Sequence, residues 1–170
     1  MKPSKLYHGT SRRISGAFKP LLKKDTEDAV HTKAAVFATE RIDLAALFMF
    51  PFDHLASIGF EEDIAYICIW GTAEEFDEKD TGGFIYVLPS ETFEKVGKDY
   101  EYQSFEAVEP EATKVFESVI DGMMACGVQV YFIDDEATFD EIVANKKNRA
   151  PLLKTLVSEN QDEEMNVMEF

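Results

Sequence analysis

The chain has 170 residues, 45% of them apolar and 12% aromatic, and its formal net charge is −16. This length suits one domain with a proper hydrophobic core, and the composition excludes an intrinsically disordered chain. Its two cysteines are too few for a disulfide framework, and no apolar run approaches the roughly 18 residues that span a bilayer. Because the first residues lack a signal-peptide pattern, we expect a cytoplasmic protein with no membrane partner.

The charge is unevenly distributed along the chain. Residues 1–33 carry eight basic and three acidic side chains, net +5, so the remaining 137 residues are net −21. Such a surface would mostly repel phosphate, which argues against indiscriminate nucleic-acid binding. Three interpretations of this asymmetry stay open. The basic segment is an ordinary solvated loop, or it holds an anionic ligand such as a diphosphate, or the acidic body binds a basic protein partner or mimics nucleic acid.

Hydrophobic patterning predicts a mixture of strands and helices without internal repeats. In chain order we expect a strand over 5–10, an irregular basic stretch over 11–33, a strand over 34–39, a helix over 42–50, a strand over 64–70, an acidic connection over 71–80, and strands over 84–88 and 100–108. An amphipathic helix over 111–126, a strand over 128–133 and a helix from about 136 follow. The fold class is therefore α+β, with the helices outside. We expect a single domain over 1–158 and an acidic C-terminal tail over 159–170.

The sequence lacks the usual signatures of metal and nucleophile chemistry. The histidines, at positions 8, 31 and 54, have no ligand-like spacing, so we expect no metal. Cys68 and Cys126 lie in apolar runs without a basic neighbour, which disfavours thiol catalysis. The sequence has neither a glycine-rich phosphate loop nor a serine nucleophile elbow.

Three short motifs remain, and they occur in series. His8-Gly9-Thr10 closes the first expected strand. Val36-Phe37-Ala38 lies on the second, which leads into a helix that contains Ala45, Ala46 and Phe48, and Glu101-Tyr102 lies on a later strand. In this order and approximate spacing the motifs resemble the ADP-ribosyltransferase-like superfamily, specifically its poly(ADP-ribose) polymerase branch with small bacterial and phage relatives. The resemblance covers about residues 5–110 and implies a split β-sheet core with peripheral helices.

The resemblance also implies roles for individual residues. Gly9 would present its backbone N–H and C=O to the nicotinamide carboxamide of NAD, and His8 would bind a ribose hydroxyl on the adenosine side. Phe48 would stack on the nicotinamide, and Glu101 would hold the nicotinamide ribose and stabilise the oxocarbenium-like transition state. Arg12 or Arg13 would pair with the diphosphate. The remaining cofactor-binding positions implied by the motifs are Thr10, Phe37 and Ala38.

At some positions the sequence departs from the family pattern. Val36 stands where the family has a tyrosine, Leu44 or Ala45 where it has a helix serine, and Glu106 competes with Glu101 as the site carboxylate. The expected function is binding of NAD, as a substrate, or of an ADP-ribose-like ligand, with transfer of ADP-ribose to a protein or nucleic acid or hydrolysis of NAD. One alternative is a non-catalytic acidic interaction protein on the same fold. Another is an enzyme of the RNA 2′-phosphotransferase type, which would use basic residues such as Arg12, Arg13 and Arg41.

Overall fold

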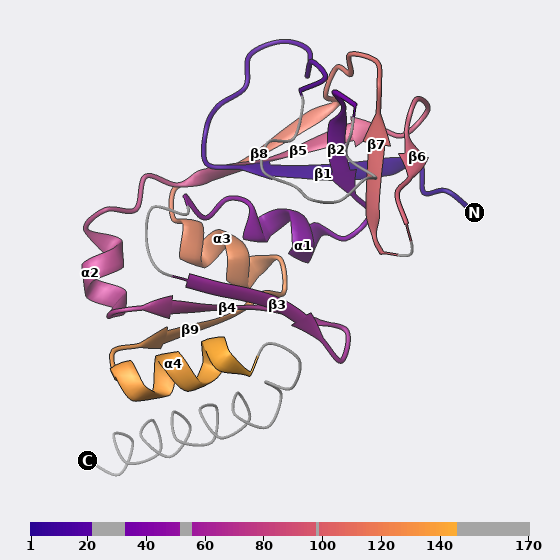
Figure 1. The fold of residues 1–170 in the computed structure, drawn as a ribbon. Helices are drawn as coiled ribbons and strands as arrows, with labels where there is room; N and C mark the ends of the chain where they lie inside the picture. The colour runs from indigo at the N-terminus through magenta and orange to yellow at the C-terminus, as the bar shows by residue number, and fades with distance from the viewer. Residues whose placement is uncertain (22–32, 52–55, 98, 146–170) are drawn as a thin grey trace.

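The computed structural model describes residues 1–21, 33–51, 56–97 and 99–145. Most of the expected basic stretch beyond residue 21, two of the three histidines and the expected acidic tail lie outside these ranges. Within them the protein is α+β, as expected, and is built from two β-sheets (Figure 1).

The larger sheet is antiparallel throughout. Its strands run in the order β6-β7-β2-β1-β5-β8. Their bounds are Lys5–Thr10 for β1, Val36–Thr39 for β2, Gly83–Pro89 for β5, Glu94–Lys95 for β6, Glu101–Ser104 for β7 and Ala112–Phe116 for β8. The first strand is therefore central, because it pairs with β2 on one side and with β5 on the other.

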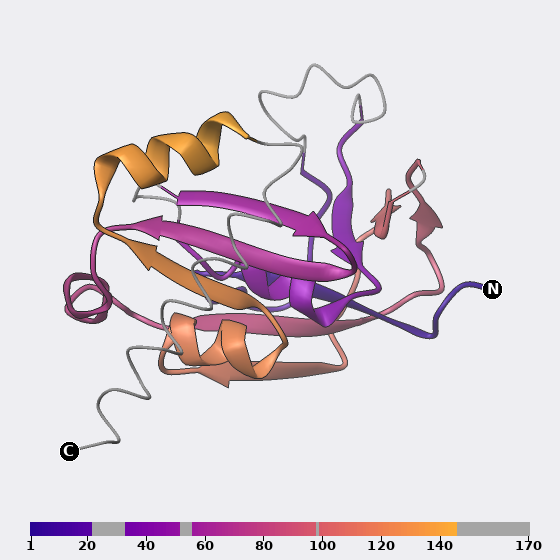
Figure 2. The same ribbon diagram turned by 90° about the horizontal axis from the view of Figure 1, so that it is seen from below.

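The smaller sheet has the order β3-β4-β9, with β3 at Ala56–Glu61, β4 at Ile64–Trp70 and β9 at Gln129–Ile133. Figure 2 shows β4 between its two neighbours. Strand β4 pairs with β3 in an antiparallel hairpin and with β9 in parallel. Its nearly continuous apolar sequence is explained by burial on both faces, since residues 65–69 are all buried. The hairpin turns at Glu62 and Asp63, which both have positive φ.

The helices occupy two kinds of position. Helices α1 (Ile42–Leu47) and α3 (Val119–Ala125) lie between the two sheets, whereas α4 (Glu136–Ala144) covers the outer face of the small sheet (Figure 1). The short α2 (Ala73–Asp77) lies at one side. The largest hydrophobic cluster joins α1, α3, β4 and β5, with Met49, Ile67, Ile85 and Met123 at 1% exposure or less. The expectation that all helices are peripheral is therefore wrong for α1 and α3, whose apolar faces form the core between the sheets.

Some expected elements differ from those observed. The expected helix over 111–126 is divided into β8 and α3, because residues 112–116 pair with β5 at the edge of the large sheet. Strand β7 ends at Ser104 rather than continuing to 108. Strand β3 and helix α2 were not expected, although Thr72 accepts a hydrogen bond from the Glu75 amide as an ordinary N-cap.

Helix α3 is held at its start by a residue far away in the sequence. The Asp80 carboxylate accepts hydrogen bonds from the amides of Val119, at 2.9 and 3.0 Å, and Gly82, at 2.9 Å, and from the Ser118 hydroxyl at 3.1 Å. A carboxylate here also interacts favourably with the positive end of the helix.

We therefore expect Asp80→Ala to lower the free energy of unfolding by about 2 kcal/mol, in the upper range for loss of a helix cap. Urea unfolding followed by circular dichroism measures the loss. Asp77→Ala is the matched control, because this exposed carboxylate lies on α2, three residues before Asp80, and accepts no hydrogen bond from the described residues of α3. Equal stability of the two variants would contradict the role of Asp80.

Candidate functional site

The three motifs come together on neighbouring strands. His8-Gly9-Thr10 ends β1, Val36-Phe37-Ala38 belongs to β2, and Glu101 begins β7. The strand order β7-β2-β1 places the three motifs side by side, although Glu101 lies 93 positions after His8 in the sequence. The centre of the large sheet is therefore the candidate site.

The ladder between β1 and β2 consists of a single registered pair, Tyr7 with Thr39. On the other side of β1, the Ser90 amide donates to the Ser4 carbonyl at 3.3 Å, and Lys5 to Thr10 pair with Pro89 to Phe84. Because hydrogen-bonded pairs alternate along an antiparallel ladder, the even-numbered residues of β1 direct their N–H and C=O groups toward β5. Those of the odd-numbered residues Tyr7 and Gly9 therefore point toward β2. Tyr7 exchanges its bonds with Thr39, and the next position, Gly9 opposite Phe37, has no registered pair.

Gly9 therefore presents a backbone donor and acceptor to the gap between β1 and β2. The registered pairing of β1 with β2 stops at Tyr7 and Thr39 and does not extend to Gly9. An N–H and a C=O of one residue that point to the same side of a strand form the kind of edge that an amide can bind, as added strands do. This is the feature of the site that a carboxamide ligand would use.

The His8 imidazole fixes the other side of this gap. Its Nδ1 lies 2.6 Å from the Phe37 carbonyl oxygen. Since a carbonyl oxygen accepts, Nδ1 carries the proton, and in the neutral ring Nε2 is an acceptor. Burial lowers the pKa of His8 below 6.5, and the bond to Phe37 opposes that shift without reversing it. The ring is therefore neutral at pH 7, with Nε2 making no hydrogen bond to any described residue.

This histidine makes stability depend on pH. In the unfolded chain His8 binds a proton near pH 6.5, whereas in the folded chain it resists protonation. The free energy of unfolding is therefore not reduced by His8 above pH 6.5, and it decreases as the pH falls from 6.5 through the lowered pKa of the folded state. We expect wild type to lose more stability than His8→Asn between pH 7.5 and 5, because asparagine donates to Phe37 without titrating. Urea midpoints at both pH values measure this. A parallel decrease in both proteins would contradict a buried neutral His8.

The sheet divides the candidate residues between its two faces. Side chains directly opposite each other share a face, so Tyr7, Thr39 and Glu101 lie on the inner face toward α1, together with Phe37. Residues His8, Thr10, Val36 and Ala38 lie on the outer face, which turns away from the small sheet. The His8 and Glu101 side chains therefore do not point into one common space on either face.

Helix α1 approaches β1 at Gly9. A Cβ at this position would lie 1.8 Å from the Ala45 carbonyl oxygen, so the absence of a side chain is required by helix packing. Phe48 follows Ala45 by three residues, caps the end of α1 and is 55% exposed. Its ring is thus available for stacking about one helical turn from the Gly9 contact.

The two alternatives for the carboxylate are placed differently. Glu101 lies on β7 opposite Thr39 and is partly buried. Glu106 lies beyond the end of β7, is exposed, and has its backbone N–H and C=O bonded to the Ser104 hydroxyl at 3.2 Å. Val36, at the tyrosine position of the family, is 4% exposed and belongs to the outer-face hydrophobic cluster, which also contains Leu6.

The segment that follows β1 folds over the outer face. The Tyr86 hydroxyl accepts from the Ile14 amide at 2.7 Å and donates to the Ile14 carbonyl at 3.2 Å, while Phe18 pairs through its backbone with Val108. The Phe18 ring lies edge-on to His8, with ring centroids 4.9 Å apart. Phe18 is a site neighbour that the sequence did not reveal, because its place depends on these distant anchors.

Two arginines project from this segment. The Arg12 amide donates to the Thr10 hydroxyl at 3.1 Å, so Thr10 closes a turn at the end of β1. Arg12 and Arg13 are both exposed, and the Arg13 guanidinium lies 5.1 Å from the centre of the Phe84 ring. The turn that carries both arginines therefore starts at the outer-face residue Thr10, and the Arg13 guanidinium lies over Phe84, which pairs with Thr10.

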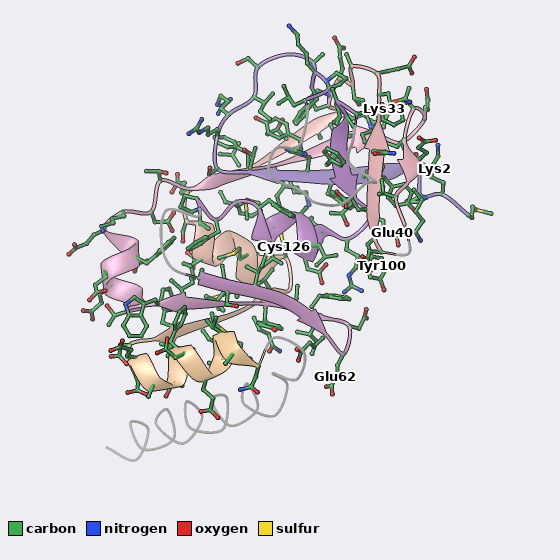
Figure 3. All side chains as sticks on the ribbon, in the orientation of Figure 1. Lys2, Lys33, Glu40, Glu62, Tyr100 and Cys126 are labelled. Carbon is green, nitrogen blue, oxygen red and sulfur yellow. The ribbon has the colours of Figure 1, made fainter. Side chains whose placement is uncertain are left out.

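A third arginine joins the two sheets. Arg41 binds both Asp43 carboxylate oxygens, at 2.8 and 3.1 Å, and pairs with Asp63 at the tip of the β3–β4 hairpin. Its guanidinium also lies over the rings of Phe60 and Tyr100, at 4.7 and 5.2 Å. Figure 3 shows Tyr100 and Glu40 at the end of β7 that faces this hairpin. Arg41 is thus engaged in structure, which leaves Arg12 and Arg13 as the exposed arginines of the described site.

Two further observations concern the described residues alone. They contain no group of three potential ligands that could hold a metal ion. None of their helices is both long enough and apolar enough to cross a membrane.

A scan against protein-family models, a search of curated proteins and a search of solved structures return no match for this chain.

Proposed function

We propose that this protein binds NAD or an ADP-ribose-like ligand at the gap between β1 and β2. The observation that carries the proposal is the end of the β1–β2 ladder after Tyr7, which leaves the N–H and C=O of Gly9 directed into that gap. A carboxamide offers one acceptor and one donor, so a single residue's N–H and C=O can bind both. This matches the role that the sequence resemblance implies for Gly9.

The neighbouring residues support the same ligand. The Nε2 of neutral His8, which is bonded to none of the described residues, can accept a hydrogen bond from a ribose hydroxyl. The exposed Phe48 ring can stack on a flat heterocycle, and Arg12 and Arg13 can pair with a diphosphate. These groups surround the end of β1 from the helix side and from the outer face.

Within this proposal the enzymatic version is transfer of ADP-ribose to a protein or nucleic acid, or hydrolysis of NAD. Glu101 would stabilise the positive charge that develops on the ribose as the glycosidic bond breaks. The test is incubation with labelled NAD, with binding, nicotinamide release and label transfer measured for wild type, His8→Ala, Glu101→Gln and Glu106→Gln. Release that is lost in Glu101→Gln and kept in Glu106→Gln supports this version. No release in wild type contradicts it.

A non-catalytic binding protein is the second candidate, and three observations favour it. Val36 is a core residue where the family has a tyrosine, and Glu101 lies on the opposite sheet face from His8. Helices α2 and α4 also present exposed carboxylates, including Glu74, Asp77 and Glu141, to a basic partner. In the labelled-NAD experiment, this candidate predicts binding without release. Release of nicotinamide by wild type would contradict it.

A further inference from the structure

A rigid row of aromatic rings runs along the outer face from His8 to Phe84. Phe18 contacts His8 at 4.9 Å and Tyr86 at 5.0 Å between ring centroids, and Tyr86 stacks on Phe84 at 6.3 Å with an interplanar angle of 30°. Tyr86 and Phe18 are 2% and 5% exposed, so both are fixed by packing. Phe84, in contrast, is partly buried, and the row ends in a ring with accessible surface.

The surface around Phe84 is apolar and positively charged at once. Val115 lies directly opposite Phe84 on the edge strand β8 and is 57% exposed. The Arg13 guanidinium lies over the Phe84 ring at 5.1 Å, and the bond from the Arg12 amide to Thr10 anchors the turn that carries both arginines. A flat heterocyclic base can stack on the Phe84 ring or on the Arg13 guanidinium, or between the two, while it contacts the apolar Val115 side chain.

The position of Phe84 relative to His8 suits the two parts of a nucleoside. His8 pairs with Tyr86 and Thr10 pairs with Phe84, so Phe84 is the diagonal neighbour of His8 on the same face. Such diagonal side chains are about 7 Å apart, and long or aromatic ones reach across that distance. A base and its ribose are joined by one bond and so need two adjacent subsites. The basic segment, net +5 in a chain of net charge −16, would favour the approach of an anionic nucleotide.

We propose that Arg13 and Phe84, with Val115 as the floor, form the subsite for the purine base of an ADP-ribose-like ligand whose adenosine ribose is held by His8. This inference rests on the proposed function. It assigns the adenine end of the ligand to the outer face over β5 and β8, away from the gap at Gly9.

The experiment is titration of the full chain with ADP-ribose by isothermal titration calorimetry. Loss of a base–aromatic stack weakens binding roughly ten-fold. We expect this loss in Phe84→Leu, which keeps the charge and the apolar character, and in the exposed Arg13→Ala. Phe84→Tyr keeps the ring and should bind like wild type. Lys19→Ala removes the same charge from the same segment and should also bind like wild type.

The outcomes separate the two proposals. Wild type that binds no ADP-ribose overturns the proposed function. Wild-type binding that is unchanged in Arg13→Ala and in folded Phe84→Leu overturns the purine subsite and leaves the proposed function standing. Equal weakening by Arg13→Ala and Lys19→Ala shows general charge attraction and also overturns the subsite. Thermal unfolding of each variant shows whether Phe84→Leu is folded, and Arg13→Ala decides if it is not.

Discussion

Gly9→Ala is expected to destabilise the protein by about 3 kcal/mol, at the top of the usual range for an overpacked site. The added Cβ would lie 1.8 Å from the Ala45 carbonyl oxygen and 2.7 Å from its carbonyl carbon. Because the obstacle is helix backbone, relief requires α1 to move away from β1. The core between the sheets would then lose contacts around Ala46 and Met49, which are both fully buried. Urea unfolding followed by circular dichroism measures the loss.

Gly83→Ala is the matched control for this experiment. It introduces the same methyl group on the same face of the neighbouring strand β5, where its nearest neighbours are atoms of the Met49 side chain at 2.8 to 3.1 Å. Methionine is flexible and can move, so we expect a loss of about 1 kcal/mol at most. If Gly9→Ala were no less stable than Gly83→Ala, the close packing of α1 on β1 would be contradicted.

Arg41→Ala is expected to destabilise the protein by about 3 kcal/mol, since it leaves a buried carboxylate without its partner. Asp43 is 8% exposed and receives two hydrogen bonds from the guanidinium. The substitution also removes the link from α1 to Asp63 on the β3–β4 hairpin and the stacking on Phe60. We expect the hairpin to be released from the start of β7, which chemical denaturation and hydrogen exchange of residues 56–64 would measure.

Two further variants define the cause. Arg41→Lys keeps the charge but cannot make the two-pronged contact with Asp43 while lying flat on the rings, so most of the loss should remain. In Arg41→Ala with Asp43→Ala, the buried charge is also removed, and part of the stability should return. Full stability of Arg41→Lys would show that charge alone matters. If the double variant lost more stability than the two single variants lose in total, the pairing of Arg41 with Asp43 would be contradicted.

Local sequence patterns predicted the strands that carry the site. The apolar stretches at 5–10, 34–39, 64–70, 84–88 and 128–133 all contain observed strands, and the helix after β2 begins at Ile42 as expected. These elements are set by near-neighbour patterning, which a single sequence contains. Metal, cofactor and partner expectations depend on molecules outside the chain and stay predictions.

The remainder depends on distant contacts. Val115 and Phe116 have a spacing that suits a helix, yet pairing with Phe84 and Gly83 makes their segment a strand. Helix α3 begins only at Val119, where Asp80 binds the first free amide. The separation of His8 and Glu101 onto opposite faces depends on the pairings Tyr7–Thr39 and Thr39–Glu101, and a shift of one residue in either would reverse it.

Binding of NAD to the wild-type chain and to His8→Asn, measured by isothermal titration calorimetry at pH 7.5, tests the central claim most directly. Asparagine can keep the bond to the Phe37 carbonyl while it removes the acceptor at Nε2. The proposal predicts that wild type binds NAD and that His8→Asn, folded and equally stable at this pH, binds it roughly ten-fold more weakly, as expected for one lost hydrogen bond. Absence of binding to wild type at millimolar NAD, or equal binding by both proteins, would contradict the site at the end of β1.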